Sequence, residues 1–247
     1  MTRCGARMGE YEESRRNAGL TLERTYVQRN PDGSTLLVVY AEGGGSMGDV
    51  ARAFATSGIP FDQWFMDMNQ DLSGIDFRRP PPGGGPEHIA SWEAPSGARG
   101  KGIALCAPLL PNKTEAGKSW AKEAFEDRRE EMTESRLALG STREEVFLNP
   151  TPMGDFAVVY IEGEDPVRAN KEFAASDRPF DPGVRGLARH AQGSDRPARR
   201  PAQGQGRHRS LEPGRTGRQR RGRSDPSRRP VLGFCRRRVG PRPRLTS

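Results

Sequence analysis

Apolar residues gather in short runs that are separated by polar and turn-forming segments. Four of these runs have the length and β-branched content of strands, and they lie at residues 36–41, 102–110, 143–149 and 156–162. Two longer segments have apolar residues at helical spacing, and they lie at residues 61–72 and 115–139. Asp165 followed by Pro166 predicts another helix start, because Asp is a favoured N-cap and proline suits the first helical turn. The runs "LLVVYA" and "FAVVYI" scarcely alternate, which predicts sheets covered on both faces.

Two parts of the chain resemble each other. Residues 12–44 align with residues 133–165, including the shared "ESR" and the shared "VVY" that is followed two residues later by Glu-Gly. The segment "FATSGIPFD" at 54–62 matches "FAASDRPFD" at 173–181. Such ordered matches predict two copies of one unit. The composite unit runs strand, helix, strand, strand, helix, a further helix and strand, which is the ferredoxin-like order.

These matches divide the chain into four parts. The predicted parts are a first α+β repeat that lacks its first strand (1–77), a Pro/Gly-rich linker (78–101), a second repeat that lacks its last helix and strand (102–182), and an Arg-rich tail (183–247). In the first repeat, "GIDF" at 74–77 is the candidate for a short final strand.

The segments "GLTLERTYVQRNPDGSTLLVVYAEG" and "PFDQWF", with their second-copy counterparts, resemble proteins of the dimeric α+β-barrel superfamily. They are distantly akin to antibiotic-biosynthesis-monooxygenase-type domains, with both halves fused in one chain. The resemblance implies an α+β fold of tandem ferredoxin-like repeats that pack sheet to sheet. For activity it implies an alternative in which a cofactor-independent enzyme acts on a small aromatic or polyketide-like substrate.

The charge of the chain is uneven. The whole sequence has 40 Lys and Arg against 32 Asp and Glu, but 19 of these arginines and only 3 of the acids lie in residues 183–247. The body is therefore acidic, and the tail alone makes the protein basic. The tail is predicted to be disordered, because it lacks the apolar residues for a core. It would bind nucleic acid only non-specifically, and a basic nucleic-acid binder is the second alternative function.

A shifted reading frame would explain the tail. One set of legal codons for residues 184–193, read one nucleotide later, encodes Phe-Ala-Asp-Trp-Leu-Ala-Thr-Leu-Lys, which would form an amphipathic helix like that of the first copy. Nineteen arginines without a lysine are also what GC-rich DNA yields out of frame. The other interpretation is a genuine basic arm.

The three cysteines are too scattered for a disulfide framework, and no apolar run reaches the length of a membrane span. We therefore expect a cytoplasmic protein with no membrane association, in which Cys106 is a small buried apolar residue. His88 is the only histidine of the body and lies in the predicted linker. We accordingly assign no catalytic residue, metal ligand or cofactor. Arg15 and Arg136 recur on the long helix and are expected to form surface salt bridges.

Tyr40 and Tyr160, each followed two residues later by Glu42 and Glu162, are the best polar candidates for ligand binding on the central strands. The competing interpretation is core tyrosines with hydroxyls at the rim. The sequence favours a non-enzymatic module that binds a small apolar ligand or a protein partner, with self-association possible through unfilled sheet edges. A closed apolar pocket with a tyrosine hydroxyl pointing into it would instead favour the enzyme.

Overall fold

The computed structural model describes residues 7–30, 33–74, 76–79, 84–183 and 229–237. The strands are β1 (Leu20–Arg29), β2 (Thr35–Gly43), β3 (Glu87–Glu93), β4 (Lys101–Pro108), β5 (Ser141–Thr151), β6 (Gly154–Gly163) and β7 (Arg229–Arg237). The helices are α1 (Met8–Asn17), α2 (Met47–Thr56), α3 (Pro60–Ser73), α4 (Thr114–Lys122), α5 (Arg129–Ala138) and α6 (Pro166–Ala175). The protein is thus a mixed α+β structure, as the sequence predicts.

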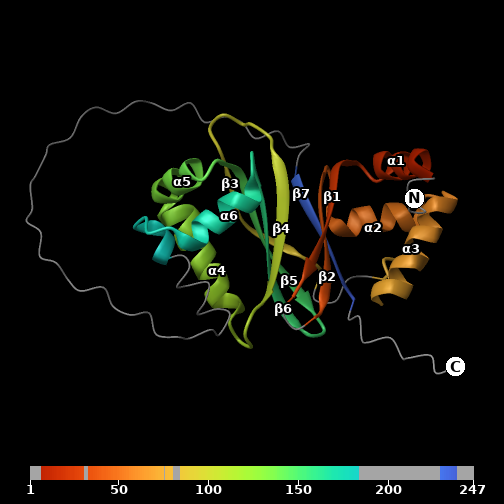
Figure 1. Cartoon of the computed structure of the whole chain (residues 1–247). Coiled ribbons are helices and arrows are strands. Elements are labelled where there is room, and N and C mark those ends of the chain that lie inside the picture. The colour runs from red at the N-terminus through yellow and green to blue at the C-terminus, as the bar shows by residue number, and fades with distance from the viewer. Residues whose placement is uncertain (1–6, 31–32, 75, 80–83, 184–228, 238–247) are drawn as a thin grey trace, which may run out of the picture.

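The strands form two antiparallel sheets. Sheet A has the order β1-β2-β7, and sheet B has the order β3-β5-β6-β4. Figure 1 shows the two sheets next to each other in the middle of the molecule, with α1, α2 and α3 outside sheet A and α4, α5 and α6 outside sheet B. Each sheet is therefore covered on both faces, which the unbroken apolar runs predict.

The contact between the sheets is apolar and well buried. Val38 and Tyr40 of β2 face Val158 and Tyr160 of β6, and all four side chains are fully buried. Because side chains alternate along a strand, the intervening residues face the helices. Val159 of β6, for example, packs against the cluster formed with the helical layer.

Local sequence signals explain several helix boundaries. The Asp165 side chain accepts a hydrogen bond from the Arg168 N–H, and Pro166 opens α6, so the predicted N-cap is confirmed. Helix α3 ends where Gly74 takes a left-handed conformation with φ of 74°. The long helix predicted at 115–139 is present but is interrupted by a π-helical turn, Glu123–Asp127, between α4 and α5.

Two predictions at the middle of the chain need correction. Residues 74–77 do not form a strand in their described part. Residues 87–93, inside the segment that composition assigns to a linker, form β3 and pair with β5. Trp92 provides the physical reason, since its side chain is only 1% exposed and packs with Phe125 and Met132. The Pro/Gly-rich residues before β3 led to the prediction of a linker, although Trp92 is a large residue that packs in the core.

The prediction for the tail is wrong at residues 229–237, which form β7 on the free edge of β2. Pro230 lies opposite Glu42 in this pairing, as Gly102 of β4 lies opposite Glu162 in sheet B. β7 therefore occupies the place beside β2 that β4 occupies beside β6. A strand here satisfies backbone groups that β2 would otherwise leave unpaired. The rest of the predicted disordered tail lies outside the described residues.

Arg15 and Arg136 are also placed differently from the surface positions that the sequence predicts. Each is 6% exposed. Arg15 Nε lies 2.8 Å from Glu23 Oε2 on β1, and Arg136 pairs in the same way with Glu144 on β5. These ion pairs tie α1 to sheet A and α5 to sheet B, so both arginines are structural.

Candidate functional site

The four candidate residues come together at one end of the contact between the sheets. The rings of Tyr40 and Tyr160 are stacked, with centroids 3.5 Å apart and planes 7° from parallel. The Tyr40 hydroxyl donates to Glu42 Oε1 at 2.9 Å, and the Tyr160 hydroxyl donates to Glu162 Oε1 at 2.5 Å. Both tyrosines and both glutamates are buried. The two hydroxyls are thus bonded inside the protein and do not lie at the rim.

Arg99 links the two glutamates across the sheets. Its Nη2 donates to Glu42 Oε1 at 2.7 Å and to Glu162 Oε1 at 2.6 Å, while its Nε donates to Glu162 Oε2 at 2.8 Å. One guanidinium therefore holds a carboxylate from each sheet, which its planar set of donors allows. Arg99 precedes β4 in a loop with no regular pattern, so the sequence gives no sign of this role.

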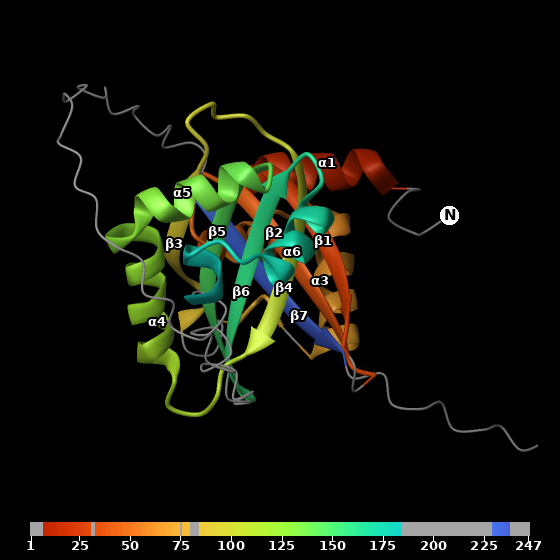
Figure 2. The ribbon, with the colours of Figure 1, turned by 60° about the vertical axis from the view of Figure 1, so that its left-hand side comes forward.

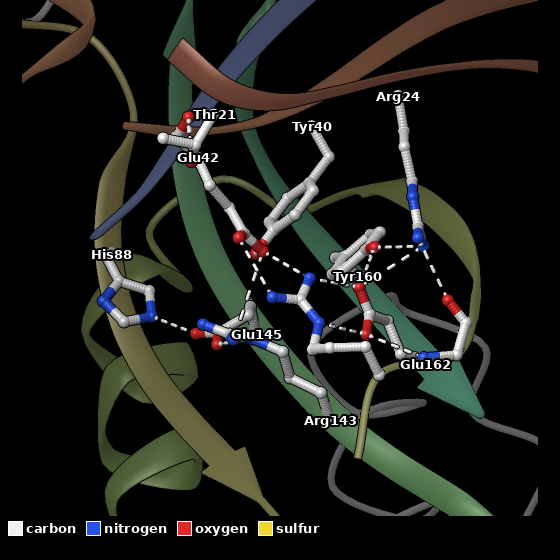
Figure 3. A network of polar contacts seen from close by, with 11 residues as sticks. Thr21, Arg24, Tyr40, Glu42, His88, Arg143, Glu145, Tyr160 and Glu162 are labelled. Carbon is white, nitrogen blue, oxygen red and sulfur yellow. Dashed lines mark hydrogen bonds and ion pairs between the residues drawn. The ribbon is translucent and has the colours of Figure 1, made fainter. Parts of the chain in front are cut away.

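Further charged residues extend the cluster on either side (Figure 3). Arg24 of β1 donates to the Tyr160 hydroxyl at 2.7 Å. Arg143 Nε donates to Glu145 Oε1 at 2.6 Å, and His88 Nε2 lies 2.7 Å from Glu145 Oε2. His88, which the sequence places in a linker, therefore lies on β3 beside a buried carboxylate. We call the whole set the Arg99 network: Arg24, Tyr40, Glu42, His88, Arg99, Arg143, Glu145, Tyr160 and Glu162.

The surroundings of the network determine its protonation. Burial raises the pKa of Tyr40 and of Tyr160, and nearby carboxylates raise both further. Burial also acts to raise the pKa of Glu162, but hydrogen bonds from Arg99 and Tyr160 outweigh it and hold that pKa below the ordinary value. Hydrogen bonds to Glu162 and Glu42 raise the pKa of Arg99. The hydroxyls thus stay protonated as donors, and Arg99 and Glu162 stay charged, which suits a static link between the sheets.

A cavity of about 340 Å³ lies on the other face of sheet B, between the strands and the helical layer. Figure 2 shows α4, α5 and α6 on the near side of this sheet. Apolar side chains make up most of its lining, including Leu105, Trp120, Val146, Val159, Ile161 and Phe173. The volume falls within the roughly 300–1,000 Å³ of small-molecule sites.

Small residues explain why this space is open. Gly117 of α4, Ala157 of β6 and Ala169 of α6 all line the cavity. A Cβ added at Gly117 would come no closer than 3.7 Å to its nearest neighbour, a methyl group of Leu109. These small side chains leave part of the space between the helices and the sheet unfilled. In the sequence, only the alternation of side chains along the strands, which shows which positions face the helices, points to the cavity.

The polar residues that line the cavity are Gln28, Trp120, Arg136, Ser141, Glu144 and Asn170. Arg136 and Glu144 are paired with each other. By contrast, the indole N–H of Trp120 is buried and has no hydrogen-bond partner among the described residues. Tyr40, Glu42, Tyr160 and Glu162 do not line this cavity. Their assignment to a ligand stays a prediction.

Gln28 of β1 borders the cavity and caps the open edge of β4. Its Nε2 donates to the Cys106 carbonyl at 2.7 Å, and the Cys106 N–H donates to Gln28 Oε1 at 2.8 Å. The amide thus pairs with β4 as the backbone of a neighbouring strand would. Cys106 itself is buried, which raises the pKa of its thiol to about 12, in line with the small apolar residue that we expect. Self-association through sheet edges stays a prediction.

Comparisons of the chain with family models, curated proteins and solved structures found no match. Among the described residues, no group of three or more His, Cys, Asp or Glu side chains is placed to hold a metal ion. The described helices include none with the length and apolar character to cross a bilayer.

Proposed function

We propose that this protein binds a small, predominantly apolar ligand in the cavity between sheet B and helices α4, α5 and α6. The observation that carries the proposal is an apolar cavity of about 340 Å³ inside a helix–sheet interface. The lining is mostly apolar, and apolar surface that stays in contact with water is unfavourable. A bound ligand would remove apolar surface of both the protein and the ligand from contact with water.

We further propose that the chain consists of two copies of one ferredoxin-like unit arranged as in the dimeric α+β barrels. The contacts of matched residues support this. In each unit an arginine of the long helix pairs with a glutamate of the next strand and lies over a phenylalanine ring; these residues are Arg15, Glu23 and Phe54 in the first and Arg136, Glu144 and Phe173 in the second. The pairing of β7 with β2 and of β4 with β6 adds to the match.

The alternative of a monooxygenase-like enzyme would place a substrate at the hydroxyls of Tyr40 and Tyr160. Those hydroxyls donate to Glu42 and Glu162, and the two rings lie against each other. The cavity on the far face of the sheet therefore gives binding more support than catalysis. The nucleic-acid alternative rests on the Arg-rich tail, most of which lies outside the described residues, and it stays a prediction.

Binding of tetralin, a bicyclic hydrocarbon without polar atoms, tests the proposal. We expect a dissociation constant on the order of 100 µM, given the affinity per atom of small ligands, and a negative heat-capacity change from the buried apolar surface. Replacing Ala157 by phenylalanine should fill the cavity and weaken binding by about tenfold or more. Isothermal titration calorimetry at several temperatures measures both quantities.

The matched control is Ala175→Phe, which adds the same side chain at an exposed position of α6. It should bind tetralin as the wild type does. Thermal unfolding of each variant checks that the fold is retained. A wild-type protein that does not bind tetralin, or a folded Ala157→Phe variant that binds it unchanged, would overturn the proposal.

A further inference from the structure

The cavity corresponds to a place that α3 covers in the first unit. When the two units are aligned through their shared segments, and α2 is aligned with α6, six lining residues have counterparts in the first unit: Arg136 (Arg15), Leu139 (Ala18), Glu144 (Glu23), Ile161 (Ala41), Ala169 (Val50) and Phe173 (Phe54). Ala41, Val50 and Phe54 form one buried cluster with Met66 of α3, and Phe65 packs against it. Side chains of α3 thus cover these positions in the first unit.

The two matched arginines show the same difference between the units. The guanidinium carbon of Arg15 lies 4.8 Å from the centroid of the Phe54 ring and 4.3 Å from that of the Phe65 ring. The guanidinium carbon of Arg136 lies 4.7 Å from the centroid of Phe173, the counterpart of Phe54. In the described part of the chain, no second ring lies over Arg136 in the way that Phe65 lies over Arg15. The side chain that α3 provides is therefore not matched in the second unit.

The first turn of this helix, by contrast, is present in both units. Asp62 of α3 accepts a hydrogen bond from Ser14 of α1, and its counterpart Asp181 accepts one from Ser135 of α5 at 2.5 Å. Both carboxylates are fully buried. Residues 180–183 are helical. The chain thus enters a helix beside the cavity in the same manner as it enters α3.

The sequence of the second unit departs from that of α3 after this turn. Asp62 is followed by "QWFMDM", whereas Asp181 is followed by "PGVRGL". Residues 184–193 contain no Phe, Tyr, Trp or Met. They therefore do not repeat the pair Phe65 and Met66, so another polypeptide is the natural source for a helix that carries such a pair.

The strands below the helix agree with this placement. In the first unit, α3 lies outside sheet A and contacts β7 (Figure 1). In sheet B, β4 takes the place of β7, and its residues Leu105 and Ala107 line the cavity. The two charged residues of the lining, Arg136 and Glu144, already form an ion pair with each other. An occupant that lies over β4 therefore needs apolar, uncharged side chains on the face that it buries.

We propose that the cavity receives the apolar face of an amphipathic helix from a partner protein, and that this helix carries an aromatic residue followed directly by a methionine or another large apolar residue. The helix lies over β4 as α3 lies over β7, and its two large side chains enter the cavity. This inference rests on the proposed function and on the proposed repeat, and it names the partner of the same site.

A peptide with the sequence of residues 64–74 tests the inference. Asp71→Lys in the peptide is joined to Asp67 by a lactam, which holds the helix before binding; both positions are exposed in α3. Calorimetry measures its dissociation constant from the full chain. The peptide with Phe65→Ala and Met66→Ala should bind about tenfold more weakly or worse. The matched control Gln70→Ala changes an exposed position of the same helix and should bind as the parent peptide does.

The protein variants connect the peptide to the cavity. Ala157→Phe should weaken the peptide about tenfold or more, Ala175→Phe should not, and tetralin should compete with the peptide. If tetralin binds and the peptide does not, the cavity takes small ligands and the inference about the helix is wrong. A peptide that binds the folded Ala157→Phe variant unchanged would also overturn it. If the peptide binds and Ala157→Phe weakens it while tetralin does not bind, the helix inference stands and the small-ligand proposal fails.

Discussion

Replacing Arg99 by methionine is expected to lower the free energy of unfolding by about 2–3 kcal/mol. Removing one partner of a buried ion pair leaves the other charge without compensation. Arg99 itself is 30% exposed, but Glu42 and Glu162 are only 3% and 0% exposed. The two glutamates would keep only their longer ion pairs, at 4.0 Å to Arg143 and 3.3 Å to Arg24. Their mutual repulsion would act directly across the contact between the sheets. Urea denaturation of the purified variant measures the loss.

Two further variants identify the cause. Arg52→Met removes an exposed arginine that pairs with Asp49 on the surface, and it should cost less than about 0.5 kcal/mol. The double variant Arg99→Met with Glu42→Gln removes one charge of each sign, so it should be more stable than Arg99→Met alone by about 1 kcal/mol or more. A loss in Arg99→Met as small as that of Arg52→Met would show that the network does not hold the sheets together.

Replacing Trp92 by alanine should cost about 3–5 kcal/mol, the usual range for removing a large aromatic side chain from a core. Trp92 is 1% exposed, packs on Phe125 and Met132, and donates its indole N–H to Thr133. The variant would leave a cavity between β3 and the helices and an acceptor without its donor. The free energy of unfolding from urea titration is again the measurement.

The control on the same strand is Glu93→Ala, an exposed position beside Trp92. Surface substitutions of this kind usually stay within about 0.5 kcal/mol. If Trp92→Ala were equally mild, residues 87–93 would behave as a linker, as their composition suggests, and not as a strand of sheet B.

The sequence predicts the regular elements where their signals are local. Continuous apolar runs identify β2 and β6, and the Asp165 cap identifies the start of α6. The sequence does not predict β3, because Trp92 is its one large core residue and a Pro/Gly-rich stretch dominates the composition around it. The sequence does not predict β7 either, because its short apolar run lies among many arginines. Its pairing with β2 is also a contact between distant parts of the chain, which local patterns do not show.

Some residues of the candidate site can be predicted from the sequence, and others are shown only by the structure. Tyr40 and Tyr160 can be located from the repeated "VVY", but only the structure shows that their rings stack on each other. Their partner Arg99 lies in a loop, so only the three-dimensional arrangement shows that it bridges Glu42 and Glu162. The cavity is harder still to predict, because it depends on small side chains from separate elements meeting at one place.

We propose that the space between sheet B and its helices is a ligand site. Its most direct test is the crystal structure of the protein with 6-bromo-1-tetralone, in which anomalous scattering locates the bromine. We predict one bromine peak in that space, in van der Waals contact with the side chains of Ala157 and Val159. A peak between the two sheets beside Tyr40 and Tyr160, or no peak at saturating ligand, would contradict a ligand site in that space.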